Sequence, residues 1–97
     1  MKGAVPHSSI TLRALPGAII SAPLADADIL RMVRASAEAI AERTGVALVS
    51  LESDDESVTA TLEGAQIVAV GFAAELRRST DAWHLRKFGM PLWGAVS

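Results

Sequence analysis

The stretch of residues 57–71 constrains the fold of this chain more than any other part of the sequence. Residues 57–62 read Ser-Val-Thr-Ala-Thr-Leu, and this alternation of polar and apolar side chains has the period of a half-buried strand. Glu63 and Gly64 follow, and a glycine supplies the positive φ that a two-residue hairpin turn requires. The sequence therefore predicts a hairpin whose second strand is residues 65–71.

A buried helix over residues 65–78 is the alternative for the second half of this segment. The Gly64 turn and the β-branched side chains of Ile67, Val68 and Val70 favour a strand, because β-branched residues are enriched in strands. We therefore expect the strand to end at Gly71 and a helix to follow it.

Two helices are predicted, over residues 23–44 and 72–88. Apolar residues recur at helical spacing in the first, and Asp26 or Asp28 can cap its start, where a carboxylate is favourable. Gly45 and Gly89 stand directly after the two helices, which is the position where glycine commonly ends a helix.

The remaining strands are residues 46–52 and, in a more ambiguous N-terminal region (residues 1–22), residues 10–13 and 18–21. The elements predict an α+β domain of two layers: a three- or four-stranded antiparallel sheet with two helices packed on one face. A chain of 97 residues suits one domain, in which residues 89–97 form an extended C-terminal tail.

The composition excludes several classes of function. The chain has no cysteine, so it has no disulfide framework, thiol nucleophile or cysteine–zinc site, and this agrees with a cytoplasmic location. The longest apolar window, residues 65–74, is too short to span a bilayer. No phosphate-binding loop, dinucleotide fingerprint or zinc-protease motif is present, and we assign no catalytic residue, cofactor or metal.

The predicted register of the sheet leaves one face partly apolar. The turn places Thr61 opposite Gln66, and pairing Glu52 with Ser57 aligns the third strand. Small apolar side chains then fill the face that receives the helices. The other face mixes hydroxyl side chains with four aliphatic ones, which are Val46, Leu48, Val68 and Val70.

Four aliphatic side chains on a solvated face need an explanation. The N-terminal residues 10–21 can cover them, a second subunit can cover them, or they stay exposed as single surface valines often do. We favour association, because burial of such side chains is a main driving force for binding.

The C-terminal residues offer a second candidate interface. Trp83, Phe88, Met90, Leu92 and Trp93 are of the types that anchor protein interfaces. The tail either folds back onto the core of its own domain or docks on a neighbour. The predicted interface residues are thus Val46, Leu48, Val68, Val70, Trp83, Leu92 and Trp93.

Two alternatives use the helix of residues 72–88. Its basic residues Arg77, Arg78, Arg86 and Lys87 can bind nucleic-acid phosphates, although the net charge of −2 is unusual for such a protein. His84 follows Asp81 by three residues, which is a general-base arrangement and suggests a small-molecule enzyme with a site at a subunit interface.

Asp54, Asp55 and Glu56 can bind a hard cation, but they lack the spacing of a calcium loop and fit an acidic turn better. The prediction that the sequence favours is a small non-enzymatic interaction module, cytoplasmic and not bound to a membrane. Its partner is a second copy in a homodimer or another protein.

Overall fold

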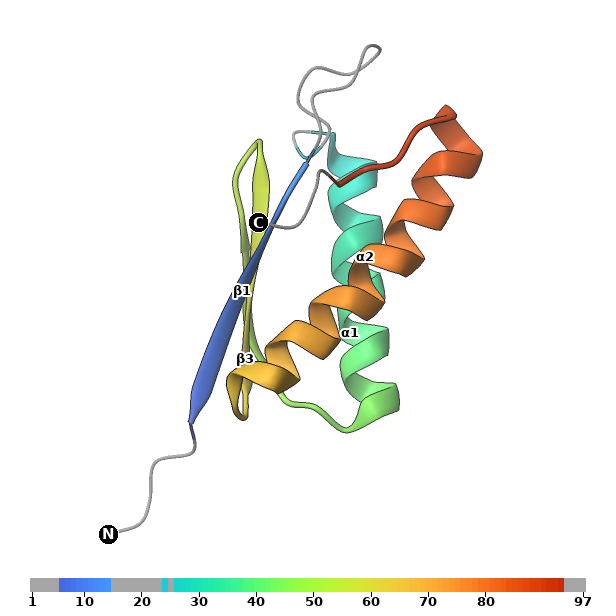
Figure 1. Cartoon of the computed structure of the whole chain (residues 1–97). Helices are drawn as coiled ribbons and strands as arrows, with labels where there is room; N and C mark the ends of the chain where they lie inside the picture. Colours follow the sequence, from blue (N-terminus) through green and yellow to red (C-terminus); the bar gives the residue numbers. More distant parts are fainter. Residues whose placement is uncertain (1–5, 15–23, 25, 94–97) are drawn as a thin grey trace, which may run out of the picture.

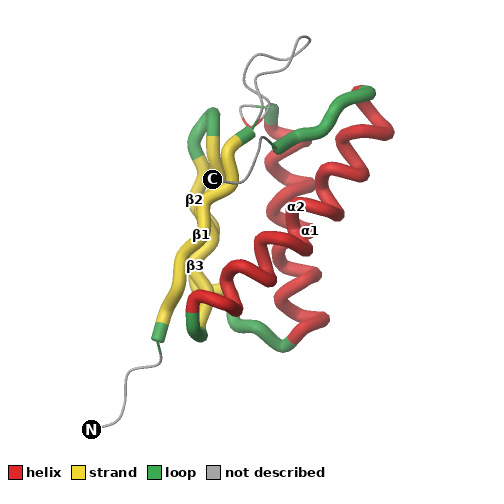
Figure 2. The backbone as a smooth tube through the Cα atoms, viewed as in Figure 1, coloured by secondary structure: helices red, strands yellow, loops and turns green. Residues whose placement is uncertain are grey.

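A β-α-β-β-α order of elements builds this protein (Figure 1). The computed structural model describes residues 6–14, 24 and 26–93. Its three strands form one antiparallel sheet, and both helices pack against the same face of that sheet (Figure 2). This confirms the predicted α+β architecture. The elements are β1 (His7–Arg13), α1 (Ala27–Thr44), β2 (Leu48–Ser53), β3 (Ser57–Glu63) and α2 (Gln66–Phe88).

Helix α1 closely follows its sequence signals. The Asp26 side chain caps its start and accepts hydrogen bonds from the amides of Asp28, at 2.9 Å, and Ile29, at 3.1 Å. Gly45 ends it in the left-handed conformation, with φ of 75°. Its buried stripe is Ile29, Val33, Ala37 and Ile40, which fixes this face of α1 against the core.

The prediction of a strand over residues 65–71 is wrong, because these residues belong to α2. Strand β3 is the central strand and has β1 and β2 as neighbours, so no edge of it is free for a further strand. Ala69, Phe72 and Leu76 are buried at helical spacing, and this packing overrides the β preference of single residues. Gly64 still makes the turn, with φ of 127°.

The N-terminal strand takes the place in the sheet that we predicted for residues 65–71. Strand β1 pairs with the full length of β3, with Ile10 opposite Ala60. The segment 18–21, predicted as a further short strand, lies outside the described residues.

A bulge in β2 changes the predicted register. Glu52 pairs with Thr59 and not with Ser57, and the register shifts between Leu48 and Ser50. Leu48 therefore lies opposite Leu62 and packs against the core together with Val46. Neither residue lies on the open face of the sheet, where we had placed both.

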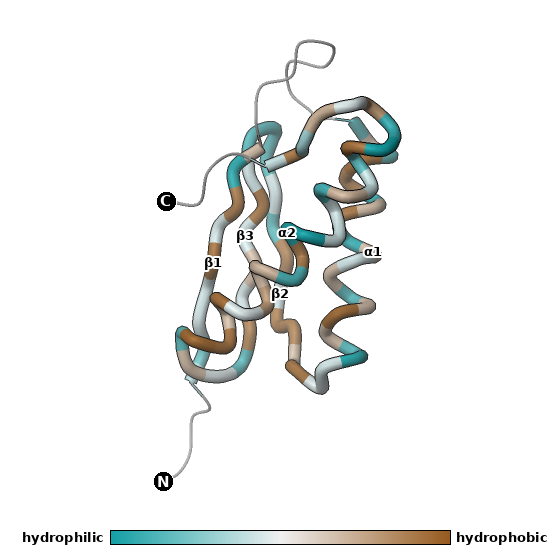
Figure 3. Tube along the Cα trace, turned by 45° about the vertical axis from the view of Figure 1, so that its right-hand side comes forward, coloured by the Kyte–Doolittle hydropathy of each residue, from teal (hydrophilic) through white to brown (hydrophobic). Residues whose placement is uncertain are grey.

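The open face of the sheet is polar along β1 and β3. Hydropathy alternates along β1 and β3 (Figure 3), so that hydroxyl side chains point away from the helices. A hydrogen bond of 2.8 Å joins the hydroxyls of Ser9 and Thr61, and another of 2.8 Å joins those of Thr11 and Thr59. The apolar second face predicted for the sheet is therefore absent from the described residues.

The core lies between the sheet and the two helices, and the C-terminal tail contributes to it. Leu92 is fully buried and Trp93 is 2% exposed, and Trp93 also forms an isolated bridge with Ala14 at the end of β1. No helix in the described residues is long and apolar enough to cross a membrane. The buried apolar residues are Leu12, Leu24, Ile29, Val33, Ala37, Ile40, Val58, Ala60, Leu62, Ala69, Phe72, Ala73, Leu76, Leu92 and Trp93.

Candidate functional site

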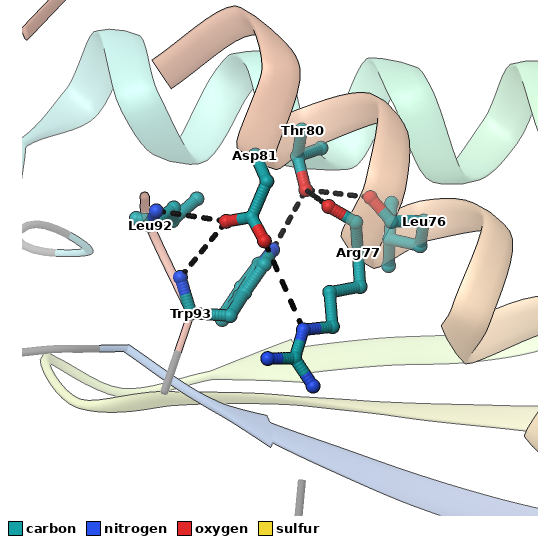
Figure 4. Close-up of polar contacts among 6 residues, drawn as sticks. All are labelled: Leu76, Arg77, Thr80, Asp81, Leu92 and Trp93. Carbon is teal, nitrogen blue, oxygen red and sulfur yellow. Dashed lines mark hydrogen bonds and ion pairs between the residues drawn. The ribbon is translucent and has the colours of Figure 1, made fainter. Parts of the chain in front are cut away.

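The second half of α2 holds the C-terminal tail through Asp81 (Figure 4). One carboxylate oxygen of Asp81 accepts hydrogen bonds from the backbone amides of Leu92, at 2.8 Å, and Trp93, at 3.1 Å. The tail thus folds back onto its own domain, which was one of the two predicted arrangements. Leu92 and Trp93 are buried there, and they do not contribute to the exposed surface.

Thr80 completes this contact from within the helix. Its hydroxyl accepts a hydrogen bond of 2.7 Å from the indole nitrogen of Trp93 and donates one of 2.6 Å to the carbonyl of Leu76. The back-bond to Leu76 lets a threonine sit inside a helix with its polar group satisfied. Residues 79–81, which prefer helix ends by type, therefore do not interrupt α2.

His84 has a structural position and is 3% exposed. Its Nδ1 lies 2.7 Å from the carbonyl of Met90, and because a carbonyl only accepts, Nδ1 carries the proton. Asp81, the carboxylate that we expected to orient this imidazole, instead bonds to the tail. The geometry required of a general base with an orienting carboxylate is therefore absent at His84.

The basic residues of α2 are partly engaged by its acidic ones. Arg77 lies 3.8 Å from Asp81, and Arg78 lies 3.1 Å from Glu75. The Lys87 ammonium lies 5.4 Å from the ring centre of Trp83, within reach of a cation–π contact. These pairings lower the positive charge that the helix presents to a phosphate backbone.

Asp54 shapes the turn between β2 and β3. Its carboxylate accepts hydrogen bonds of 2.8 Å from the amides of Glu56 and Ser57. These bonds, that of Glu56 foremost, hold the pKa of Asp54 below its ordinary value. Among the described residues, no group of three or more His, Cys, Asp or Glu is placed to hold a metal ion.

The first half of α2 carries an apolar surface on its outer side. We call this the outer stripe, and it consists of Ile67, Val70, Gly71 and Ala74, all exposed. Ile67 is 75% exposed and Val70 is 47% exposed. The spacing i, i+3, i+4, i+7 places the four residues on one helical face. Because Ala69, Phe72, Ala73 and Leu76 are buried on the opposite side, this half of α2 is apolar on two sides.

A groove runs beside the outer stripe. It has a volume of about 250 Å³ and lies where the end of α1 and the segment before β2 meet the start of α2. Six of its eight lining residues are apolar, which distinguishes it from an ordinary hydrated surface. The lining residues are Ile40, Thr44, Val46, Ile67, Val68, Gly71, Phe72 and Glu75.

Glu75 forms the charged rim of this groove. Its carboxylate accepts a hydrogen bond of 2.9 Å from Arg43 of α1 and pairs with Arg78 at 3.1 Å. The hydrogen bond from Arg43 is the main reason that the pKa of Glu75 is below its ordinary value. Glu75 thereby connects the two helices at the surface.

Gly71 is unexplained by the packing of its own chain. A Cβ added at Gly71 would meet no atom of the described residues within 4 Å, apart from the backbone of its own helix. Its backbone is helical, so it is not needed for a positive φ. A glycine inside an exposed helix costs about 1 kcal/mol relative to alanine.

The structure brings together three of the seven predicted interface residues. Val46 and Val68 line the groove, and Val70 lies beside them in the outer stripe. Leu48 packs against the core, and Leu92 and Trp93 are buried members of that core. Trp83 is half-buried at the other end of α2.

The outer stripe itself was missed, since Ile67, Gly71 and Ala74 were not among the predicted interface residues. The helical spacing of the two apolar faces in residues 65–78 was the signal that could have identified it.

No protein-family model matches this sequence, and a search of curated proteins finds no significant match. The site is therefore interpreted from its own geometry.

Proposed function

We propose that this chain is a small, non-enzymatic interaction module that associates with a second copy through the outer stripe and the adjacent groove. The observation that carries the proposal is the outer stripe, in which Ile67 is 75% exposed next to an apolar groove. A contiguous apolar surface of this kind is typical of an interaction site. The unexplained Gly71 supports the same surface, because it leaves room for another backbone.

The size of the stripe indicates a reversible complex. Full burial of an isoleucine or a valine contributes about 1.5–3 kcal/mol each, whereas association costs about 4–15 kcal/mol in lost freedom. Two side chains from each of two subunits, Ile67 and Val70, contribute at most about 6–12 kcal/mol together, which is of the same size as this cost. We therefore expect a weak dimer whose population depends on protein concentration.

The other two hypotheses have less support. A nucleic-acid site on α2 is weakened by the ion pairs of Arg77 and Arg78, which leave Arg86 and Lys87 as the remaining basic residues of the helix. An enzyme site at His84 is weakened by the burial of that side chain.

Sedimentation of the full chain tests the proposal, with Val70→Glu as the diagnostic variant. A glutamate in the outer stripe places two charges in the apolar contact, so we expect the dimer to dissociate. Val49→Glu is a matched control, since Val49 is 49% exposed and Val70 is 47% exposed, and Val49 lies on β2 outside the groove lining. The control should keep the dimer.

A monomer at all concentrations up to the millimolar range would overturn the proposal. Equal dissociation by both variants would show that association uses another surface. Circular dichroism of both variants distinguishes a lost interface from a lost fold.

A further inference from the structure

Strand β1 lies at one side of the sheet and has β3 as its neighbour within the sheet. The amide of Ala14 and the carbonyl of Pro6 both form hydrogen bonds with backbone groups next to the ends of β3. Since backbone groups alternate in direction along a strand, the even-numbered residues of β1 bond to β3. The backbone N–H and C=O groups of Ser9 and Thr11 therefore point away from the sheet, and we call them the β1 edge.

The two outer strands of the sheet differ in how they are protected from pairing with another chain. Strand β2 has a bulge between Leu48 and Ser50 and carries the charged Glu52, and bulges and charges are two devices that prevent pairing at a sheet edge. Strand β1 pairs with β3 in one unbroken register, and its residues 8–12 are uncharged. Protection of the β1 edge must therefore come from other parts of the chain.

Two contacts cover the β1 edge, one towards each end of the strand. At the first, Nε2 of Gln66 in α2 donates a hydrogen bond of 3.4 Å to the outward carbonyl of Ser9. At the second, Trp93 forms its bridge with Ala14, and it does so on the outer side, because the amide of Ala14 bonds towards β3. The two hydrogen bonds from tail amides to Asp81 hold the tail in this place.

We propose that Gln66 and the C-terminal tail together block strand addition at β1, and that a chain without these two contacts pairs its β1 antiparallel with β1 of a second copy. An uncovered row of backbone N–H and C=O groups is complementary to another extended strand. The proposal is independent of the association through the outer stripe, since it concerns the edge of the sheet. It gives the polar contacts of the tail a second role besides completing the core.

The side chains of β1 favour a second copy as the added strand. A two-fold axis at Ile10 places Ser9 of each copy opposite the partner's Thr11, and all four residues then exchange their outward hydrogen bonds. The hydroxyls of Ser9 and Thr11 already bond to Thr61 and Thr59 within the sheet. The pairing continues this row of hydroxyls from one copy into the next, and cross-strand pairs of Ser and Thr are stabilising.

The full chain with both Gln66→Ala and Asp81→Ala tests the proposal by sedimentation. We expect this double variant to associate more tightly than wild type by about tenfold or more, the equivalent of about one net backbone hydrogen bond. The amides of Ser9 and Thr11 should become protected from hydrogen exchange as it associates. Asp55→Ala removes the same charge from an exposed turn and should associate as wild type does.

Proline variants identify the edge that is used. Thr11→Pro removes an outward N–H and no hydrogen bond to β3, and proline is tolerated on an edge strand. When it is added to the double variant, it should return association to the wild-type level. Ser9→Pro removes the other outward N–H and serves the same purpose if Thr11→Pro unfolds the chain, which a urea unfolding curve shows.

A double variant that associates no more tightly than wild type would overturn the proposal. Association of the double variant that survives both proline changes would overturn it as well, because another surface would then be responsible. The comparison is always between variant and wild type, whereas the proposed function depends on whether wild type itself associates. Failure of one is therefore distinguishable from failure of the other.

Discussion

The two halves of α2 are covered in different ways. Residues 79–88, the closed half, receive the C-terminal tail of the same chain, with Leu92 fully buried and Trp93 2% exposed. Residues 66–78, the open half, carry the outer stripe, where Ile67 is 75% exposed. The closed half of α2 is therefore completed by its own chain, whereas the outer side of the open half is apolar and exposed.

The difference lies in the chemistry of the contacts. In the closed half, polar side chains fix the geometry: Asp81 binds two backbone amides and Thr80 binds the indole of Trp93. In the open half, the exposed side has apolar residues, and its polar contacts are surface ion pairs such as that of Glu75 with Arg78. The closed half is thus fixed by directional hydrogen bonds, whereas the exposed side of the open half offers mainly apolar contacts.

The largest expected effect on stability comes from removing the tail side chain that is buried against the closed half. Trp93→Ala removes a buried indole and its hydrogen bond to Thr80, so we expect a loss of about 3–5 kcal/mol in the free energy of unfolding. Urea denaturation followed by circular dichroism measures it. Leu85→Ala, on an exposed side chain of the same helix, is the control and should change stability by less than about 0.5 kcal/mol.

A loss as small as that of the control would mean that the tail contributes nothing to the fold, and the contrast between the two halves would disappear.

A smaller effect is expected from the carboxylate that holds the tail. Asp81→Ala leaves the amides of Leu92 and Trp93 without their acceptor, at a cost of about 1–3 kcal/mol. Asp81→Asn keeps an oxygen acceptor in the same place and should recover part of this loss. Amide hydrogen exchange at Leu92 and Trp93 should accelerate in the alanine variant before exchange in β3 does, and uniform acceleration would contradict a local role.

The closed half also shows how far sequence reasoning reached. The Trp-rich tail and the alternative that it folds onto its own core were visible from residue types. The acceptors were not, because Asp81 lies eleven residues from Leu92, and a sequence does not show which carboxylate a returning segment meets. The role of Thr80 was not visible for the same reason, since its partner Trp93 lies thirteen residues away in the sequence.

The open half shows where the prediction from sequence failed. Ile67, Val68 and Val70 predicted a strand because β-branched residues favour strands, but this preference is small compared with tertiary packing. The deciding fact was that β1 occupies the edge of β3, a contact about 50 residues apart in sequence. The layers, α1 and β3 were predicted correctly because each has a local signal: a cap, a terminal glycine or an alternation of period two.

The smallest effect concerns the ion pairs of the open half and depends on pH. The pKa of Glu75 is lowered in the folded state, chiefly by the hydrogen bond from Arg43. A group with a depressed pKa stabilises the fold above its ordinary value, here 4.5, and this stabilisation is lost as the pH falls through the folded-state pKa. Glu75→Gln should therefore lower the melting temperature slightly at pH 7 and not at pH 2.

High salt, like low pH, should remove the difference in melting temperature between wild type and Glu75→Gln. The Glu75 side chain is 35% exposed, so ions in the solvent screen its charge. Glu38→Gln is the control, as Glu38 is exposed on α1 and takes part in no ion pair among residues 26–93. A Glu75→Gln difference that persists at pH 2 or in 1 M salt (about a 3 Å screening length) would show that Glu75 acts by packing. Glu75 would then join α1 to the open half of α2 by a fixed contact of the same kind as those in the closed half.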